Sequence, residues 1–102
     1  MGDLIRLNLG CGQVRLPGFI GVDNNPNATA ADIVHDLNCF PYPFADNSVG
    51  EVIMNHVLEH LDSPIKLLIE LYRICADGAK IRACNKIKLT FCTGHAKIKA
   101  WR

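Results

Sequence analysis

The sequence lacks the features that mark membrane-spanning, secreted and disulfide-rich proteins. None of its apolar runs approaches the roughly 18 residues that a membrane-spanning helix needs. The N-terminus has no basic segment followed by an apolar leader, so we expect a cytoplasmic protein without a membrane partner. The five cysteines are odd in number and form no C-x-x-C pair, which argues against a disulfide framework and against a zinc ribbon.

Acidic residues are missing from the last quarter of the chain. All ten lie at or before Asp77, whereas seven of the eleven lysines and arginines follow it. A basic segment can bind nucleic acid, but this one has no aromatic RNA-binding motif and no helix-turn-helix spacing, so we expect no nucleic-acid partner. We expect residues 82–102 to form a solvated basic tail that packs partly on the acidic part of the chain.

Short apolar segments, each ending in a glycine or a polar residue, predict strands. Four of them precede both predicted helices, at residues 4–9, 18–23, 31–37 and 49–55. The segment over 56–61 is expected to turn away as a short helix. Residues 79–93 alternate weakly and predict one or two further strands.

The clearest predicted helix begins after Ser63, which suits the N-cap, with Pro64 at the first helical position. Asp77 and Gly78 are expected to end it, because glycine readily adopts the left-handed cap conformation. The three- and four-residue spacing predicts a buried stripe made of Ile65, Leu68, Ile69, Tyr72 and Cys75. The residues expected on the exposed side are Lys66, Glu70 and Arg73.

Strands alternating with loops and helices predict an open, mostly parallel α/β sheet of the Rossmann-like kind. Ligands in such sheets bind beyond the carboxyl ends of the strands. The candidate ligand-binding residues follow those ends: Gly10, Cys11, Gly12, Asp23, Asp36, Asn55 and His56.

A third glycine is missing from the loop after the first strand. Its place in a G-x-G-x-x-G phosphate-binding pattern is taken by Arg15, and the segment that follows is too short for a normal crossover helix. The residues present suit a ligand with a ribose diol, an adenine and an amino-acid end, but no phosphate. Asp23 is expected to accept from the ribose hydroxyls and Asp36 from the adenine amino group. Asp23 also suits the capping of the turn that follows it.

Four motifs then resemble one family in both order and spacing. "LNLGCG", "GVD", "DIVHDLNCFPYPFADNSV" and "EVIMNHVLEHL" are similar to the successive motifs of class I S-adenosylmethionine-dependent methyltransferases, close to the type 11 group. The resemblance covers residues 4 to about 81. It implies that the cofactor is S-adenosylmethionine, that the activity is methyl transfer to an unknown acceptor, and that residues 1–81 are the cofactor-binding domain.

The resemblance also implies a role for each matching position. The glycine loop would lie against the methionine part of the cofactor, and Asp23 with its neighbour Asn24 would bind the ribose. Asp36 and Leu37 would face the adenine. Asn55 and His56 would line the cofactor near the transferable methyl group, and His56 is the one nearby candidate for a base. Cys11, lying between two glycines, is expected to fill space under the loop.

Three departures from the family pattern stand out. Asn8 replaces a common acid in the first motif, which weakens any contact with the cofactor's ammonium group. Gly50 replaces a usual aspartate, which we expect to loosen the start of the fourth strand. The resemblance fades after about residue 81, so the sheet is expected to be incomplete relative to the full methyltransferase fold and the chain truncated. We therefore expect cofactor binding to be weak or absent, and little or no turnover by this chain.

Two other functions compete with methyl transfer. An incomplete parallel sheet exposes an open edge, which favours a non-catalytic α/β fragment that forms a homodimer. His56, Glu59 and His60 also form the H-x-x-E-H pattern of a zinc peptidase. A zinc site needs a third protein ligand, and only His95 follows Asp77 as a candidate, so no metal site is expected.

Overall fold

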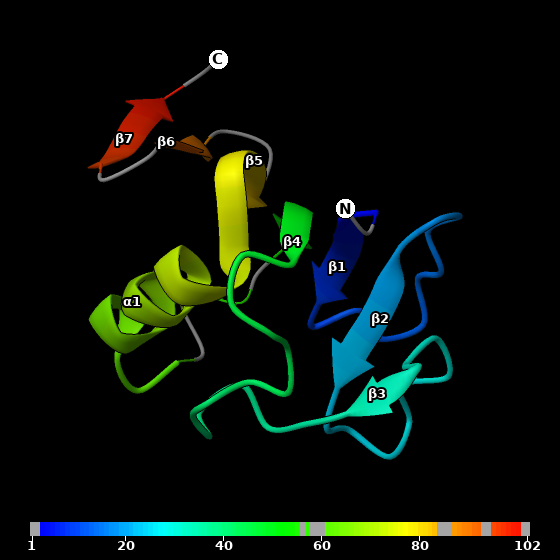
Figure 1. Cartoon of the computed structure of the whole chain (residues 1–102). Coiled ribbons are helices and arrows are strands. Elements are labelled where there is room, and N and C mark those ends of the chain that lie inside the picture. Colours follow the sequence, from blue (N-terminus) through cyan, green and yellow to red (C-terminus); the bar gives the residue numbers. More distant parts are fainter. Residues whose placement is uncertain (1–2, 56, 58–60, 84–86, 93–94, 101–102) are drawn as a thin grey trace.

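One sheet of seven strands and one helix make up the part of the chain that this computed structural model describes, namely residues 3–55, 57, 61–83, 87–92 and 95–100 (Figure 1). The elements in chain order are β1 (Ile5–Leu9), β2 (Ile20–Asp23), β3 (Ile33–Val34), β4 (Val49–Met54), α1 (Pro64–Ile74), β5 (Cys75–Ala83), β6 (Ile87–Cys92) and β7 (His95–Ala100). No helix in these ranges is long and apolar enough to cross a bilayer.

The strands follow the order β3-β2-β1-β4-β5-β6-β7, and the first five run parallel to one another. The predicted open, mostly parallel α/β sheet is therefore confirmed. The chain builds outwards from β1 to β2 and β3 on one side, then returns to place β4 on the other side (Figure 1). Such a reversal separates the loops after the two central strands and leaves a crevice at their carboxyl ends.

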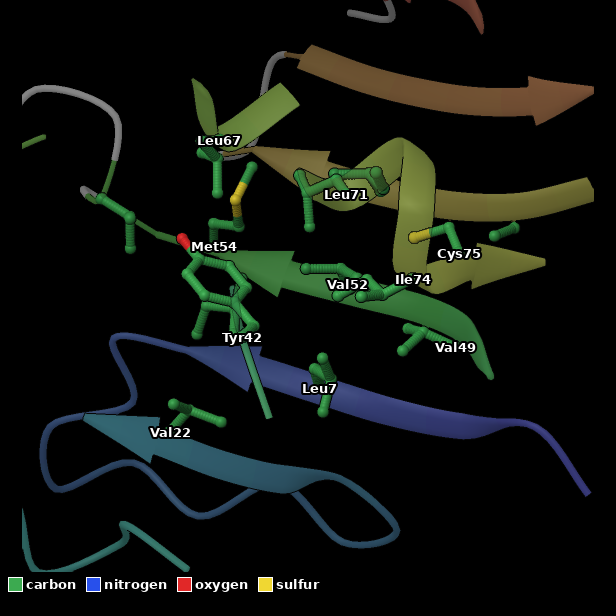
Figure 2. Close-up of a cluster of buried hydrophobic side chains, with 14 of the residues drawn as sticks. Leu7, Val22, Tyr42, Val49, Val52, Met54, Leu67, Leu71, Ile74 and Cys75 are labelled. Atoms are coloured by element: carbon green, nitrogen blue, oxygen red, sulfur yellow. The ribbon is translucent and has the colours of Figure 1, made fainter. Parts of the chain in front are cut away.

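Apolar side chains from the central strands meet α1 on one face of the sheet (Figure 2). Each fully buried leucine there contributes roughly 1.5–3 kcal/mol relative to an exposed one. Members of this core include Leu7, Leu9, Val22, Val52 and Met54 from the strands and Leu67, Leu71 and Ile74 from the helix. Alternate strand residues lie on the opposite face, where Arg6 and Glu51 pair at 4.0 Å.

The helix starts as predicted and ends earlier. Ser63 is the N-cap, its Oγ accepts the backbone N–H of Lys66 at 3.3 Å, and Pro64 takes the first position. The predicted end at Asp77 and Gly78 is wrong, because the helix stops at Ile74 and Cys75 already pairs with Val49 in the sheet. The pairing of β5 with β4 ends the helix before the chain reaches the glycine that was expected to cap it.

The predicted buried stripe of α1 is wrong for most of its members. Ile65 and Ile69 are 70% and 65% exposed, and Tyr72 is also exposed. The face against the sheet consists of Leu67, Glu70, Leu71 and Ile74. Both stripes have helical spacing, and the buried one contains a glutamate because that carboxylate has partners inside the fold, described below.

The basic tail continues the sheet. β6 pairs antiparallel with β5, and β7 pairs antiparallel with β6. The strands predicted within residues 79–93 are confirmed as the end of β5 and the whole of β6, whereas β7 lies beyond the predicted segment. The backbone of 87–92 and 95–100 extends the sheet on the side of β5. We had instead expected a solvated tail that packs partly on the acidic part of the chain. β3 spans only two residues, shorter than the predicted segment. The short helix expected over 56–61 falls mainly on residues outside the described ranges.

Gly50 lies at an irregular point of β4. The register with β1 passes from Ile5 opposite Val49 to Arg6 opposite Glu51, which leaves Gly50 as the extra residue of a bulge. A Cβ on Gly50 would come within 3.0 Å of the Leu4 side chain. The glycine therefore accommodates a tight approach at the start of β4, where we had expected it to loosen the strand.

Candidate ligand site at the strand ends

A pocket of about 360 Å³ opens at the carboxyl ends of the parallel strands. This volume lies within the range of small-molecule sites, roughly 300–1,000 Å³. The residues that line it are Gly10, Asp23, Asn24, Asn25, Asp36, Leu37, Asn38, Asn55, Val57 and Leu61. The fold thus brings together, from four separate segments, six residues that the sequence singled out: Gly10, Asp23, Asn24, Asp36, Leu37 and Asn55.

The glycine loop after β1 forms one wall of this pocket. The backbone N–H of Gly10 donates to Val22 O at 2.7 Å, which ties the loop to β2. Gly10 has a φ of +67°, and a Cβ there would lie 2.7 Å from Val57 Cγ2. Only glycine fits without strain at a position that combines a left-handed conformation with so close a neighbour.

Asp23 ends β2 with both carboxylate oxygens oriented by backbone groups. Oδ2 accepts from the N–H of Gly12 at 2.9 Å, and Oδ1 accepts from the N–H of Asn25 at 3.0 Å. The expected turn-capping role of Asp23 is therefore present alongside its place in the pocket. Each carboxylate oxygen has two acceptor directions, so one backbone bond apiece leaves capacity for two hydroxyl donors.

Gly21 allows the segment after β2 to pack directly beneath the loop. A Cβ on Gly21 would lie 2.3 Å from Ala30 O and 3.0 Å from Cys11 Sγ. The N–H of Ala30 in turn donates to Gly12 O at 3.1 Å. We missed Gly21 in the sequence, although a glycine inside an apolar strand is itself a signal of close backbone approach.

Cys11 and Asn8 pack beside the glycine loop, buried and away from the pocket lining. Cys11 is buried, and burial first, then the nearby Asp23 charge, raises the pKa of its thiol. Asn8 is also buried, and its Nδ2 donates to Val14 O at 3.1 Å. Asn8, Cys11 and Gly12 are not among the lining residues.

Arg15 also helps to hold the glycine loop in place. Its guanidinium pairs with Asp32 Oδ1 at 3.1 Å, and Asp32 Oδ2 accepts from the N–H of Gly21 at 2.9 Å. These bonds, that from Gly21 first, lower the pKa of Asp32. Arg15, which stands in the place of the third glycine, thus links the loop to the segment after β2.

Residues 36–38 form the opposite wall. Asp36 Oδ1 accepts from the N–H of Asn38 at 2.9 Å, closing a turn. Asn38 Oδ1 accepts from the N–H of Asp62 at 3.0 Å, and Leu37 O accepts from the hydroxyl of Tyr42 at 2.8 Å. We refer to Asp36, Leu37 and Asn38 as the 36–38 wall.

The aromatic residues of the next loop lie under this wall. Tyr42 is buried, its ring stacks on Phe40 with 5.2 Å between centroids, and it meets His35 edge-on. Burial, followed by the charges of Glu70 and Asp36, raises the pKa of Tyr42. Tyr42 therefore belongs to the core, as Figure 2 also shows, and its hydroxyl contacts the pocket wall at the backbone of Leu37.

Of the two residues predicted to line the cofactor at the end of β4, only Asn55 lies within the described residues. Asn55 lines the pocket. His56, like Glu59 and His60 of the H-x-x-E-H pattern, lies outside the described ranges. Among the residues that are described, no three histidine, cysteine or acidic side chains gather as a metal site.

Known structures resemble this arrangement over most of the chain. A complex of the Trm112 methyltransferase activator with a methyltransferase, from Haloferax volcanii, gives a TM-score of 0.62 at 19% identity and covers 79% of this chain and 45% of that one. A SAM-dependent methyltransferase from Aquifex aeolicus gives 0.60 at 17%, covering 76% and 54%. An S-adenosylmethionine-dependent methyltransferase from Mesorhizobium loti gives 0.64 at 13%, covering 99% and 58%.

These similarities establish the fold. The chain spans about half the length of the solved structures that it matches. A search among curated proteins finds no matching relative. Residues 7–83, well over half of the chain, match the family described as a methyltransferase domain, and the chain therefore belongs to that family.

Proposed function

We propose that this domain binds S-adenosylmethionine and presents its methyl group to an acceptor molecule. The observation that carries this proposal is the Asp23 carboxylate, held at the pocket by the N–H groups of Gly12 and Asn25. A carboxylate fixed in this way is pre-organised to accept from a ribose diol. Residues 1–81 would then form the cofactor-binding domain, and 82–102 the basic tail.

The other lining residues fit the remaining parts of the same ligand. The glycine loop at Gly10 would lie against the methionine part, and Asn8, whose Nδ2 bonds to Val14 O, is not among the residues that line the pocket. Asp36 would accept from the adenine amino group and Leu37 would cover its ring. Asn55, with His56 beside it in the sequence, would lie near the methyl group.

The bound cofactor would supply an activated methyl group on a sulfonium sulfur. The protein's own contribution would be positional, because an in-line displacement gains most from aligned reactants and excluded water. Asp23 and the 36–38 wall would fix the nucleoside, while the glycine loop would fix the amino-acid end. His56 is the candidate to take up a proton from the acceptor.

Calorimetric titration with S-adenosylhomocysteine tests the proposal directly. Asp23→Ala removes the acceptor for both ribose hydroxyls, and losing about 3 kcal/mol or more would weaken binding by about 100-fold or more. Asp77→Ala is the matched control, because Asp77 is an exposed acid near the amino end of β5, away from the pocket. No binding by the wild type, or equal binding by the two variants, would refute the proposal.

Self-association is the second candidate, and the outward face of α1 favours it. Ile65 and Ile69 lie one turn apart, and both are largely exposed. The outermost strands β3 and β7 also offer edges of the sheet to a second copy. Light scattering after size-exclusion chromatography decides this point, and a monomer at high concentration would refute it.

A further inference from the structure

An ion pair on α1 holds the loop that precedes β4. Arg73 Nε and Nη2 donate to the two carboxylate oxygens of Glu70, at 2.8 and 2.7 Å. The same guanidinium donates to Tyr42 O at 3.1 Å, to Phe44 O at 3.0 Å and to Asp46 Oδ1 at 2.7 Å. One side chain of α1 therefore joins three residues of the loop to the helix.

Glu70 completes this attachment from the buried side. The residue is only 7% exposed, and its Oε2 also accepts the backbone N–H of Tyr42. The hydrogen bonds from Arg73 outweigh burial and lower the pKa of Glu70, so the carboxylate is ionised at neutral pH. Both backbone groups of Tyr42 are thus fixed by the Glu70–Arg73 pair.

Tyr42, whose backbone is held by Glu70 and Arg73, also contacts the pocket wall. Its ring lies in the core beside the sheet (Figure 2), and its hydroxyl donates to Leu37 O. The contact is made at the middle residue of the 36–38 wall. An unbroken series of direct contacts therefore leads from the helix to the wall: Arg73 to Glu70, Glu70 to Tyr42, and Tyr42 to Leu37.

We propose that Glu70 and Tyr42 are positioning residues, which set the place of the 36–38 wall and hence the preference of the pocket for an adenine-like base. This inference rests on the proposed function, because Asp36 is the group there that would accept from the adenine amino group. Neither residue is among those that line the pocket, so each acts through Leu37. The wall is ordered by the helix as well as by its own turn.

Amide hydrogen exchange tests the ordering of the wall without any ligand. The reporters are the N–H groups of Asn38, Cys39 and Asp62, which bond to Asp36 Oδ1, Asp36 O and Asn38 Oδ1. Tyr42→Phe keeps the ring and removes the bond to Leu37 O, so these amides should exchange about fivefold faster, as expected for one lost hydrogen bond. Ser48→Ala is the matched control, since it removes the Ser48–Ala45 hydroxyl–carbonyl bond of the same loop, away from the wall.

Two ligands then test the preference for the base. S-adenosylhomocysteine carries the amino group, and S-inosylhomocysteine replaces it with a carbonyl that would face Asp36. The wild type should favour the adenosyl form by about tenfold or more, as expected for a lost bond to a charged acceptor. In Tyr42→Phe and Glu70→Gln this ratio should fall by about fivefold, whereas Ser48→Ala should leave it unchanged. General destabilisation would weaken both ligands alike and leave the ratio unmoved.

The possible outcomes separate the inference from the function on which it rests. Unchanged exchange in Tyr42→Phe, or faster exchange with an unchanged ligand ratio, would overturn the inference. If Glu70→Gln does not fold, Tyr42→Phe alone decides. If the wild type binds neither ligand, the proposed function fails, and the exchange rates still decide whether Tyr42 orders the wall.

Discussion

Replacing Gly21 with alanine tests the packing beneath the glycine loop. The added Cβ would stand 2.3 Å from Ala30 O, where ordinary van der Waals contact of a Cβ begins at 3.4 Å, so a shift of about 1 Å is needed. The obstacle is backbone and not a side chain that can rotate away. Ala30 is itself buried, and its N–H is bonded to Gly12 O.

The expected loss of stability follows from two contributions. Overpacking of this kind costs about 1–3 kcal/mol. Moving Ala30 also strains its bond to Gly12 and the paired bonds between Gly21 and Asp32, each worth about 0.5–1.5 kcal/mol. We therefore expect Gly21→Ala to lower the free energy of unfolding by about 2–5 kcal/mol. That is a large part of the total for a small domain, which is about 5–15 kcal/mol.

Urea denaturation followed by circular dichroism measures this loss. With a slope of about 1.5 kcal/mol per molar urea, a loss of 3 kcal/mol lowers the midpoint by about 2 M. Gly50→Ala is the matched control, because its Cβ would meet only Leu4, whose Cβ lies 3.0 Å away, so a shift of a few tenths of an ångström by this half-exposed residue relieves the contact. We expect a change within about 1 kcal/mol there. Equal losses in the two variants would refute the packing argument.

Three further predictions concern stability and reactivity. Gly10→Ala should destabilise by about 2–4 kcal/mol in the same assay, since it adds strain at φ +67° to a 2.7 Å contact with Val57; a loss below 1 kcal/mol would contradict it. The pKa of Glu70 is lowered in the folded state, so its carboxylate stabilises the fold fully above pH 4.5, its ordinary pKa, and this stabilisation is lost as the pH falls through the lower folded-state pKa. In Glu70→Gln the free energy of unfolding should therefore fall less steeply as the pH is lowered below 4.5. A pH dependence parallel to that of the wild type would count against this. Burial raises the pKa of Cys75 to about 12, so iodoacetamide at pH 8 should modify exposed Cys39 well before Cys75 by peptide mass spectrometry, and similar rates would show that Cys75 is accessible.

The strand ends were predictable from the sequence because they depend on local order. Asp23, Asp36 and Asn55 each follow an apolar segment, and parallel strands bring their carboxyl ends to one edge whatever the details of packing. Naming these strand ends needed no knowledge of which strands pair. For that reason Gly10, Asp23, Asp36 and Asn55 line the same pocket, together with Asn24 and Leu37, which the family resemblance had added.

The face of α1 was not predictable in this way. Its sequence offers two apolar stripes, and the rule that charged residues stay outside favoured the wrong one. Glu70 lies inside because Arg73 and the N–H of Tyr42 satisfy its carboxylate, and these partners come together only once the loop has folded onto the helix. A buried charge of this kind depends on tertiary contacts, which periodicity alone does not report.

The strand order also has a consequence for how the domain acquires its pocket. β5, β6 and β7 are joined in sequence and pair antiparallel, so they are able to form early by closing short loops. The pairing of β1 with β4 must instead enclose the whole of β2 and β3. Long-range parallel pairing is slow, and we expect it to complete the sheet last. A chain that has folded only its C-terminal hairpins has no pocket, so any ligand of this site would recognise and stabilise the finished domain alone.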